Sequence, residues 1–124
     1  MTIKQSLVVV VDDDESVRES LPDLLGEFGF TVRTFPSAEA YIASDSMTQT
    51  SCLILDAAMP GMSGPDLQRE LARRGHDIPI IFITAQEDGN LRRCVMDRGA
   101  VDCLFKPFSE SQLMGALNTA LRVA

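Results

Sequence analysis

The chain has 124 residues, of which 45% are hydrophobic and 23% are charged, and its formal net charge is −7. This length is that of one ordinary domain, so we expect residues 1–124 to share a single core. The acidic balance disfavours direct binding to nucleic acid, which usually requires a basic surface. The longest apolar run, residues 7–11, is too short to cross a membrane, and no cleavage-site pattern follows it. A cytoplasmic location without membrane contact is therefore expected.

Short apolar runs alternate with amphipathic segments along the chain, which is typical of a βα repeat. Residues 7–11 predict a central parallel strand, and the helix after it is predicted to end at Gly29. Residues 30–35 alternate apolar and polar side chains, as expected for an edge strand. Ser37 is placed to cap a short second helix.

The second half of the chain repeats this order three times. Its predicted strands are residues 52–55, 80–83 and 101–105. The helix after the first of them is expected to begin at Gly64 and Pro65, and the helix after the second to end at Gly99. Ser109 and Gln112 have the spacing of a capping box and predict the start of the last helix. Five strands and five helices result.

The three cysteines are Cys52, Cys94 and Cys103, and their spacing is not that of a metal or redox motif. We interpret all three as small side chains that pack in strands or on the inner side of a helix. Cys94 is expected to lie with Leu91 and Val95 on the buried side of the fourth helix.

Reactive side chains follow directly after four of the predicted strands. Asp12 and Asp13 follow the first strand, Asp56 the third, Thr84 the fourth and Lys106 the fifth. Because the carboxyl ends of parallel strands meet at one edge of an open sheet, we expect these side chains to share one crevice. Three carboxylates, a hydroxyl and an ammonium group suit a divalent cation and a phosphoryl group.

Four segments of the chain resemble, in this order, the receiver domain of two-component response regulators. They are VVDDDESVR at residues 10–18, LDAAMPGMSG at 55–64, ITA at 83–85 and GAVDCLFKPF at 99–108. Each stands at the end of a predicted strand, so the set is far more specific than any one motif. The resemblance covers essentially the whole chain and implies a flavodoxin-like, doubly wound parallel sheet with strand order 2-1-3-4-5.

The resemblance also implies the chemistry. Asp56 matches the residue that accepts a phosphoryl group from a sensor histidine kinase or phosphotransfer protein, with Mg²⁺ as cofactor. Asp13 and Asp56 are expected to bind the metal directly, Asp12 mainly through water, and Ala58 through its backbone carbonyl. In this family the protein is a signalling switch that catalyses only its own phosphorylation and dephosphorylation.

Further positions are implied around the phosphoryl group. Thr84 and Lys106 are expected to contact its oxygens, and the backbones of Ala57 and Ala85 to lie beside it. The bond between Lys106 and Pro107 is predicted to be cis, because only an X–Pro bond adopts cis at small cost.

Phosphorylation is expected to pull Thr84 and Lys106 inward and to change the surface of the fourth helix, fifth strand and fifth helix. That surface would control an output domain, a partner protein or formation of a homodimer. Many receivers have an aromatic residue three positions before the lysine, where this chain has Cys103. We therefore hypothesise a modified switch that involves Thr84 and the loop after it, including Gln86 and Glu87.

Two alternatives stay open. The pattern Asp12-x-Asp14, with Thr84 and Lys106, is also similar to that of haloacid-dehalogenase-like phosphatases, in which Asp12 would be the nucleophile. Against this, the chain offers only Asp102 as an acidic residue near the last strand and has no cap domain. The other alternative is an interaction module with a receiver fold that works without phosphorylation, which an absence of Mg²⁺ binding would favour.

Overall fold

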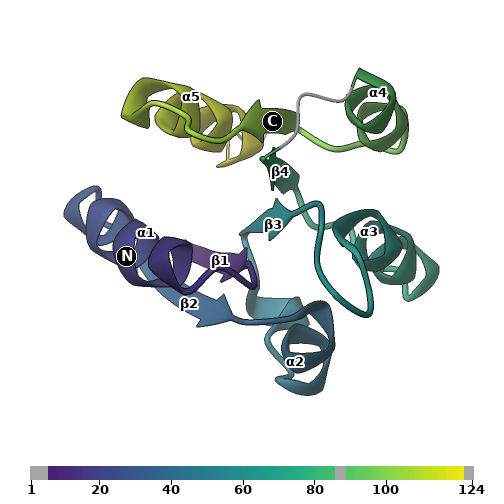
Figure 1. Ribbon diagram of the computed structural model, residues 1–124. Helices are drawn as coiled ribbons and strands as arrows, with labels where there is room; N and C mark the ends of the chain where they lie inside the picture. The colour runs from purple at the N-terminus through teal and green to yellow at the C-terminus, as the bar shows by residue number, and fades with distance from the viewer. Residues whose placement is uncertain (1–5, 86–88, 122–124) are drawn as a thin grey trace.

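The structure, a computed structural model, describes residues 6–85 and 89–121. Strands and helices alternate along these residues (Figure 1). The strands are β1 (Leu7–Val11), β2 (Thr31–Phe35), β3 (Cys52–Asp56), β4 (Ile80–Thr84) and β5 (Asp102–Phe105). The helices are α1 (Glu15–Glu27), α2 (Ala38–Ala43), α3 (Gly64–Arg73), α4 (Gly89–Asp97) and α5 (Glu110–Leu121), with a short 3₁₀ helix at Met47–Gln49.

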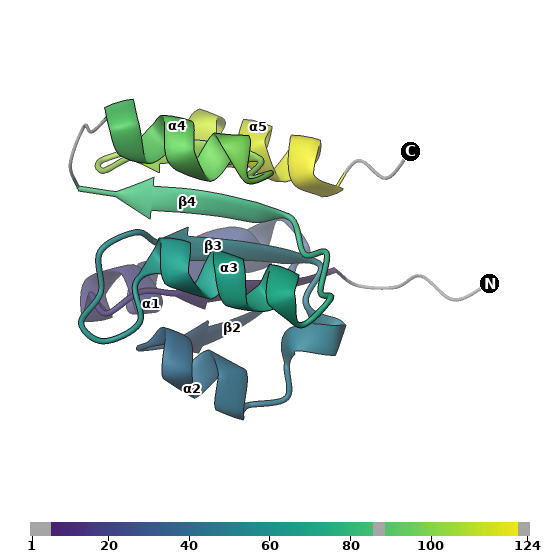
Figure 2. The same ribbon diagram turned by 90° about the vertical axis from the view of Figure 1, so that its right-hand side faces the viewer.

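The five strands form one parallel sheet in the order β2-β1-β3-β4-β5. Helices α1 and α5 cover one face of the sheet, and α2, α3 and α4 cover the other (Figure 1). In Figure 2 the strand arrows point to the same side, so their carboxyl ends share one edge. The predicted flavodoxin-like (βα)5 fold is therefore confirmed, with β2 as a partly exposed edge strand. None of the described helices is long and apolar enough to cross a membrane.

Alternation along the strands divides the core into two clusters, one on each face of the sheet. One cluster lies between the sheet and helices α3 and α4. The helices contribute Leu67, Leu71 and Val95, and the strands contribute Val9, Val11, Leu53, Leu55 and Phe82. The second cluster lies between the sheet and helices α1 and α5. The helices contribute Leu21, Leu25, Leu113 and Leu117, and the strands contribute Val8, Val10, Ile54, Ile81 and Ile83. Asp12 and Asp56 each stand two positions after members of the second set. The alternation therefore assigns both carboxylates to the α1 and α5 side.

Short-range capping fixes where the helices begin, as the sequence predicts. Ser37 accepts a hydrogen bond from the Ala40 N–H at the start of α2. Ser109 and Gln112 form the predicted capping box before α5, with reciprocal bonds of 2.8 and 3.0 Å. Gly29 has a φ of +89°, which a glycine adopts without strain, just after the end of α1.

The prediction for Cys94 is wrong, because this side chain is exposed. Helix α4 buries Val95 and partly buries Leu91, four positions apart, and Cys94 falls outside this narrow stripe. Cys52 and Cys103 are buried, as predicted. Burial raises the pKa of the Cys52 thiol to about 12, so this thiol stays protonated and packs as a small apolar group.

Gly64, the first residue of α3, lies where a side chain would meet the backbone of β3. A Cβ there would stand 2.4 Å from the Asp56 carbonyl oxygen and 2.9 Å from the Ala57 Cα. We predict that Gly64→Ala lowers the free energy of unfolding by about 1–3 kcal/mol, because the backbone must shift. Chemical denaturation measures this change.

Gly115→Ala is the matched control, because a Cβ at this exposed position of α5 would meet nothing within 4 Å. This variant should gain about 0.5–1 kcal/mol from the higher helix propensity of alanine. Equal stability changes in the two variants would contradict the close approach at Gly64.

Candidate functional site

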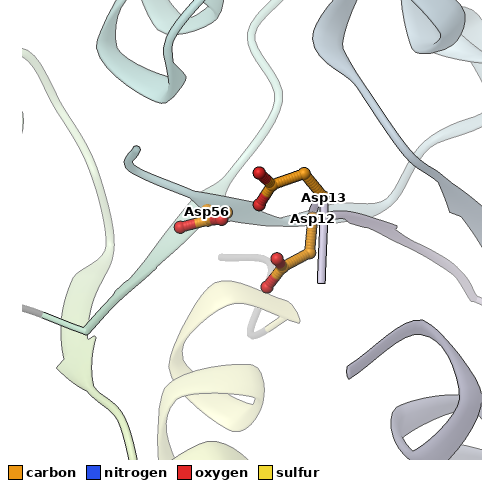
Figure 3. Close-up of side chains that lie close together, drawn as sticks. All are labelled: Asp12, Asp13 and Asp56. Carbon is orange, nitrogen blue, oxygen red and sulfur yellow. The ribbon is translucent and has the colours of Figure 1, made fainter. Parts of the chain in front are cut away.

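Three carboxylates meet at the carboxyl ends of β1 and β3. These strands are hydrogen-bonded neighbours with Val11 in register with Leu55, so the residues that follow are neighbours too. One carboxylate oxygen each from Asp12, Asp13 and Asp56 lies within 4.8 Å of the others. Figure 3 shows the Asp12 and Asp13 carboxylates beside that of Asp56. The predicted convergence of these three residues is confirmed.

Asp12 is fully buried and is held by hydrogen bonds at every polar group. Its N–H donates to the Phe35 carbonyl at 3.1 Å, which ties the end of β1 to β2. Its Oδ1 accepts from the Asp14 N–H at 2.9 Å, and its Oδ2 accepts from the Lys106 Nζ at 3.0 Å. Its carbonyl accepts from the Arg18 Nη1 at 2.8 Å. Asp12 is therefore held in place on one side of the acidic pocket, the space between the carboxylates of Asp12, Asp13 and Asp56.

Lys106 brings a positive charge to the acidic residues. It follows β5, and its N–H donates to the Thr84 carbonyl at 2.8 Å, which joins the ends of β4 and β5. Burial lowers the pKa of Lys106. The hydrogen bond to Asp12 and the charges of Asp12 and Asp56 raise this pKa by more than burial lowers it, so the net shift is upward. The ammonium group therefore stays charged. The bond between Lys106 and Pro107 is cis, as predicted.

Asp56 is buried and, unlike Asp12, forms no ion pair with Lys106. It is 5% exposed, and its Oδ1 accepts a long hydrogen bond of 3.3 Å from the Ala58 N–H. Burial raises the pKa of Asp56 to about 7, the hydrogen bond and charge of Asp12 add to the rise, and the charge of Lys106 opposes it. A cation beside Asp56 would favour its ionised form.

The backbone of Ala57, predicted to lie beside the phosphoryl group, forms hydrogen bonds to β4 and α3. The Ala57 N–H donates to the Ile83 carbonyl at 2.9 Å, and the Ala57 carbonyl accepts from the Gly64 N–H at 3.1 Å. The next residue, Ala58, is exposed and directs its N–H to the Asp56 carboxylate. Strand pairing continues one residue past Asp56, which moves the available amide from Ala57 to Ala58.

Thr84 is buried at the end of β4, beside the strand that carries Asp56. It stands two positions after Phe82, so the alternation assigns its side chain to the α3 and α4 side of the sheet, opposite to Asp56. Ala85 follows as an exposed residue at the same edge of the sheet. Gln86 and Glu87, which the sequence also singles out, lie outside the described residues.

Cys103 is buried in β5, at the edge of the sheet, and its backbone is capped by side chains. The Arg92 Nη1 donates to the Cys103 carbonyl at 2.6 Å, and the Cys103 N–H donates to the Asp102 Oδ1 at 2.8 Å. Arg92 and Asp102 also form an ion pair of 3.3 Å. This pair joins α4 to β5 and covers backbone groups that an edge strand leaves unpaired.

The donor atoms of the acidic residues fit a hard divalent cation. All three side chains offer carboxylate oxygens, which Mg²⁺ and Ca²⁺ prefer over nitrogen or sulfur. Asp13 is exposed, and one of its carboxylate oxygens lies within 4.8 Å of an Asp56 oxygen, so a cation from solvent would reach both. The arrangement therefore supports binding of a cation next to a carboxyl group whose charge is poorly compensated.

Comparisons with known proteins agree with this geometry. The model of the family "Response regulator receiver domain" matches residues 8–118. Response regulator protein TmoT of Ectopseudomonas mendocina is 43% identical over 124 residues, which cover 100% of this chain and 56% of that protein. The chain spans about half the length of the curated relatives it matches.

Solved structures give the same result. The response regulator StyR is 44% identical with a TM-score of 0.89, over 96% of this chain and 60% of that one. FixJ-N is 35% identical with a TM-score of 0.86, over 98% of both chains.

The raised pKa of Asp56 predicts how stability depends on pH. The folded state holds this proton more tightly than the unfolded state, where the pKa returns to its ordinary value of 3.8. The contribution of Asp56 to the free energy of unfolding should therefore be full below pH 3.8, fall as the pH rises, and be lost above pH 7.

Without divalent cations at pH 8, Asp56→Asn should raise the free energy of unfolding, on the order of 2 kcal/mol, because it removes a buried charge. Urea denaturation of both proteins from pH 4 to pH 8 measures the difference. Asp23→Asn, at an exposed position of α1, is the control. A wild-type protein as stable as Asp56→Asn at pH 8 would contradict the electrostatic analysis.

Proposed function

Because the chain belongs to the family of response regulator receiver domains, we propose that Asp56 accepts a phosphoryl group and that Lys106 and Thr84 respond to it. A receiver domain is a signalling switch rather than a conventional enzyme, and receivers of two-component systems pair with histidine kinases. The observation that carries the proposal is the meeting of Asp12, Asp13 and Asp56 in one pocket.

The hydrogen bonds distinguish the nucleophile from its neighbours. Both Asp12 oxygens accept short hydrogen bonds, from the Asp14 N–H and the Lys106 Nζ, whereas Asp56 accepts a long one from Ala58. The Asp56 carboxylate is therefore the better placed to attack. These contacts, with the family match, argue against the phosphatase alternative in which Asp12 is the nucleophile.

In the proposed step an Asp56 carboxylate oxygen attacks the phosphorus of a phosphohistidine on the partner kinase or phosphotransfer protein. A P–O bond forms as the P–N bond breaks, and the electron pair of the broken bond stays on the imidazole nitrogen. When the other ring nitrogen of the phosphohistidine carries a proton, the leaving group is a neutral histidine, and the product on this chain is an acyl phosphate on Asp56. Positioning and charge neutralisation carry such a transfer, because the protein supplies little other covalent chemistry.

We propose Mg²⁺ as the cation of the acidic pocket. When bound, it would offset the charge of the carboxylates and of the phosphoryl oxygens. Asp13 and Asp56 are the proposed direct ligands, with the Ala58 backbone carbonyl. Asp12 is the proposed ligand through water, because its own oxygens already accept from Lys106 and Asp14.

The remaining residues would bind the phosphoryl oxygens. Lys106 already reaches the pocket, and a phosphoryl group on Asp56 would offer its ammonium group a second anionic partner. The Ala58 N–H, which donates to the Asp56 carboxylate, is one proposed backbone donor, and Ala85 is the other. The Thr84 hydroxyl would donate from the α4 side of the sheet, and so would transmit the event toward α4, β5 and α5.

The surface formed by α4, β5 and α5 is the proposed output surface of the switch. We propose that phosphorylation changes how α4, β5 and α5 bind an output domain, a partner protein or a second copy of the chain. Arg92 and Asp102, which join α4 to β5, lie within this surface. The small Cys103 side chain leaves Thr84 and the Arg92 contact as the proposed link between the pocket and α4.

Small phosphodonors test the acceptor directly. Wild-type protein incubated with acetyl phosphate and Mg²⁺ should gain one hydroxylamine-labile phosphoryl group, and peptide mapping should place it on Asp56. Asp56→Asn should lose the label, because an amide is not a nucleophile here, and the exposed Asp23→Asn should keep it. Label that persists in Asp56→Asn and disappears in Asp12→Asn would instead support the phosphatase alternative.

Thr84 variants test the proposed transmission. With beryllofluoride and Mg²⁺, wild-type protein should show amide shift changes at Asp56 and also in α4 and β5. Thr84→Ala should bind the phosphate mimic but lose most of the change around Arg92 and Cys103, and Thr84→Ser should retain it because the hydroxyl remains. Changes confined to the acidic pocket in wild-type protein would refute the switch.

A further inference from the structure

Arg18 connects α1 to the turn that carries the acidic residues. It is the fourth residue of the helix, where its N–H donates to the carbonyl of Asp14, the N-cap residue, at 3.2 Å. Its side chain runs back past the start of the helix, and its Nη1 donates to the Asp12 carbonyl at 2.8 Å. The side chain is half-buried, so this contact is partly shielded from water.

The Asp12 carbonyl lies beyond the last paired residue of β1. Val11 is the final residue of that strand, and the parallel ladder with β3 ends at the pair Val11 and Leu55. A buried carbonyl beyond the end of a ladder needs another donor, because an unpaired polar group is costly. The Arg18 guanidinium supplies this donor.

This contact bears on the direction of Asp13. The other groups of Asp12 are bound by Phe35, Asp14 and Lys106, so the carbonyl contact completes the restraint of the peptide plane that leads into Asp13. Asp13 itself is exposed, and its carboxylate must lie near that of Asp56 for both to bind one cation. The backbone before Asp13 is what Arg18 holds.

We propose that Arg18 is a positioning residue for the metal site, which holds the turn at Asp12 and Asp13 so that the Asp13 carboxylate meets Asp56. The inference rests on the proposed function, namely that these carboxylates bind Mg²⁺. Groups that orient metal ligands commonly change metal affinity by about tenfold or more when they are removed.

The charge of Arg18 acts in the opposite direction to its hydrogen bond. A guanidinium group near the pocket repels a cation, so loss of the charge alone would strengthen Mg²⁺ binding. Solvent and salt weaken this repulsion because the group is only half-buried. The two effects differ in sign, and the direction of the change in affinity therefore separates positioning from simple charge.

The test is the Mg²⁺ dissociation constant of variants of the 124-residue chain, measured by titration calorimetry and by amide shifts of Asp13 and Asp56. Arg18→Met, which removes the donor and keeps an unbranched chain, should weaken Mg²⁺ binding by about tenfold. Arg18→Lys keeps the charge and a donor and should recover part of this loss. Arg98→Met removes the same charge from an exposed site near the end of α4 and should match wild type.

A second readout separates positioning from loss of the fold or of the nucleophile. In Arg18→Met, the Mg²⁺ concentration for half-maximal labelling by acetyl phosphate should rise about tenfold, while the rate at saturating Mg²⁺ stays near that of wild type. Unchanged or tighter Mg²⁺ binding in Arg18→Met would overturn the proposal. If Arg18→Met fails to fold, the test moves to Arg18→Lys, whose shorter side chain reaches the carbonyl less well: Mg²⁺ affinity equal to wild type in this variant would overturn the proposal, and weaker binding would support it. Failure of wild-type protein to bind Mg²⁺ would instead overturn the proposed function.

Discussion

Mutual repulsion among three carboxylates is the constraint on which this structure depends. Asp12, Asp13 and Asp56 bring their charges within 4.8 Å of one another, and two of them are buried. Lys106 compensates Asp12 directly, which leaves Asp56 with a pKa raised to about 7 by burial and by its acidic neighbours. Because the fold holds these carboxylates together, it favours binding of a cation at this edge of the sheet.

The doubly wound sheet provides the rigidity that such an arrangement needs. Parallel pairing brings the ends of β1 and β3 together, and two apolar clusters hold these strands from both faces. Contacts from β2, β5 and α1 then converge on Asp12 through Phe35, Lys106 and Arg18. The reactive carboxyl group of Asp56 therefore lies at the end of a paired strand and faces a neighbour, Asp12, that is held in place.

Strand-end residues were the most predictable part of the site. Four apolar runs are each followed by a polar residue, and this pattern was sufficient to predict that Asp12, Asp13 and Asp56 lie close together. Residue patterns do not show how far a strand pairs, so the hydrogen bond from the Ala57 N–H to the Ile83 carbonyl could not be predicted from the sequence. The exposure of Cys94 and the contact of Arg18 with the Asp12 carbonyl could not be predicted in this way. Both depend on the direction of a side chain, which the spacing of apolar residues does not determine in a short helix or for a long side chain that reaches back toward the start of its helix.

Site-resolved NMR titration of the Asp56 carboxyl carbon tests the central claim most directly. Without divalent cations, this carboxyl group should titrate near pH 7, and Mg²⁺ should move its titration to lower pH because the bound cation favours the ionised form. A titration near pH 4 that Mg²⁺ does not change would contradict the account, because the carboxylates would then neither repel one another nor share a cation.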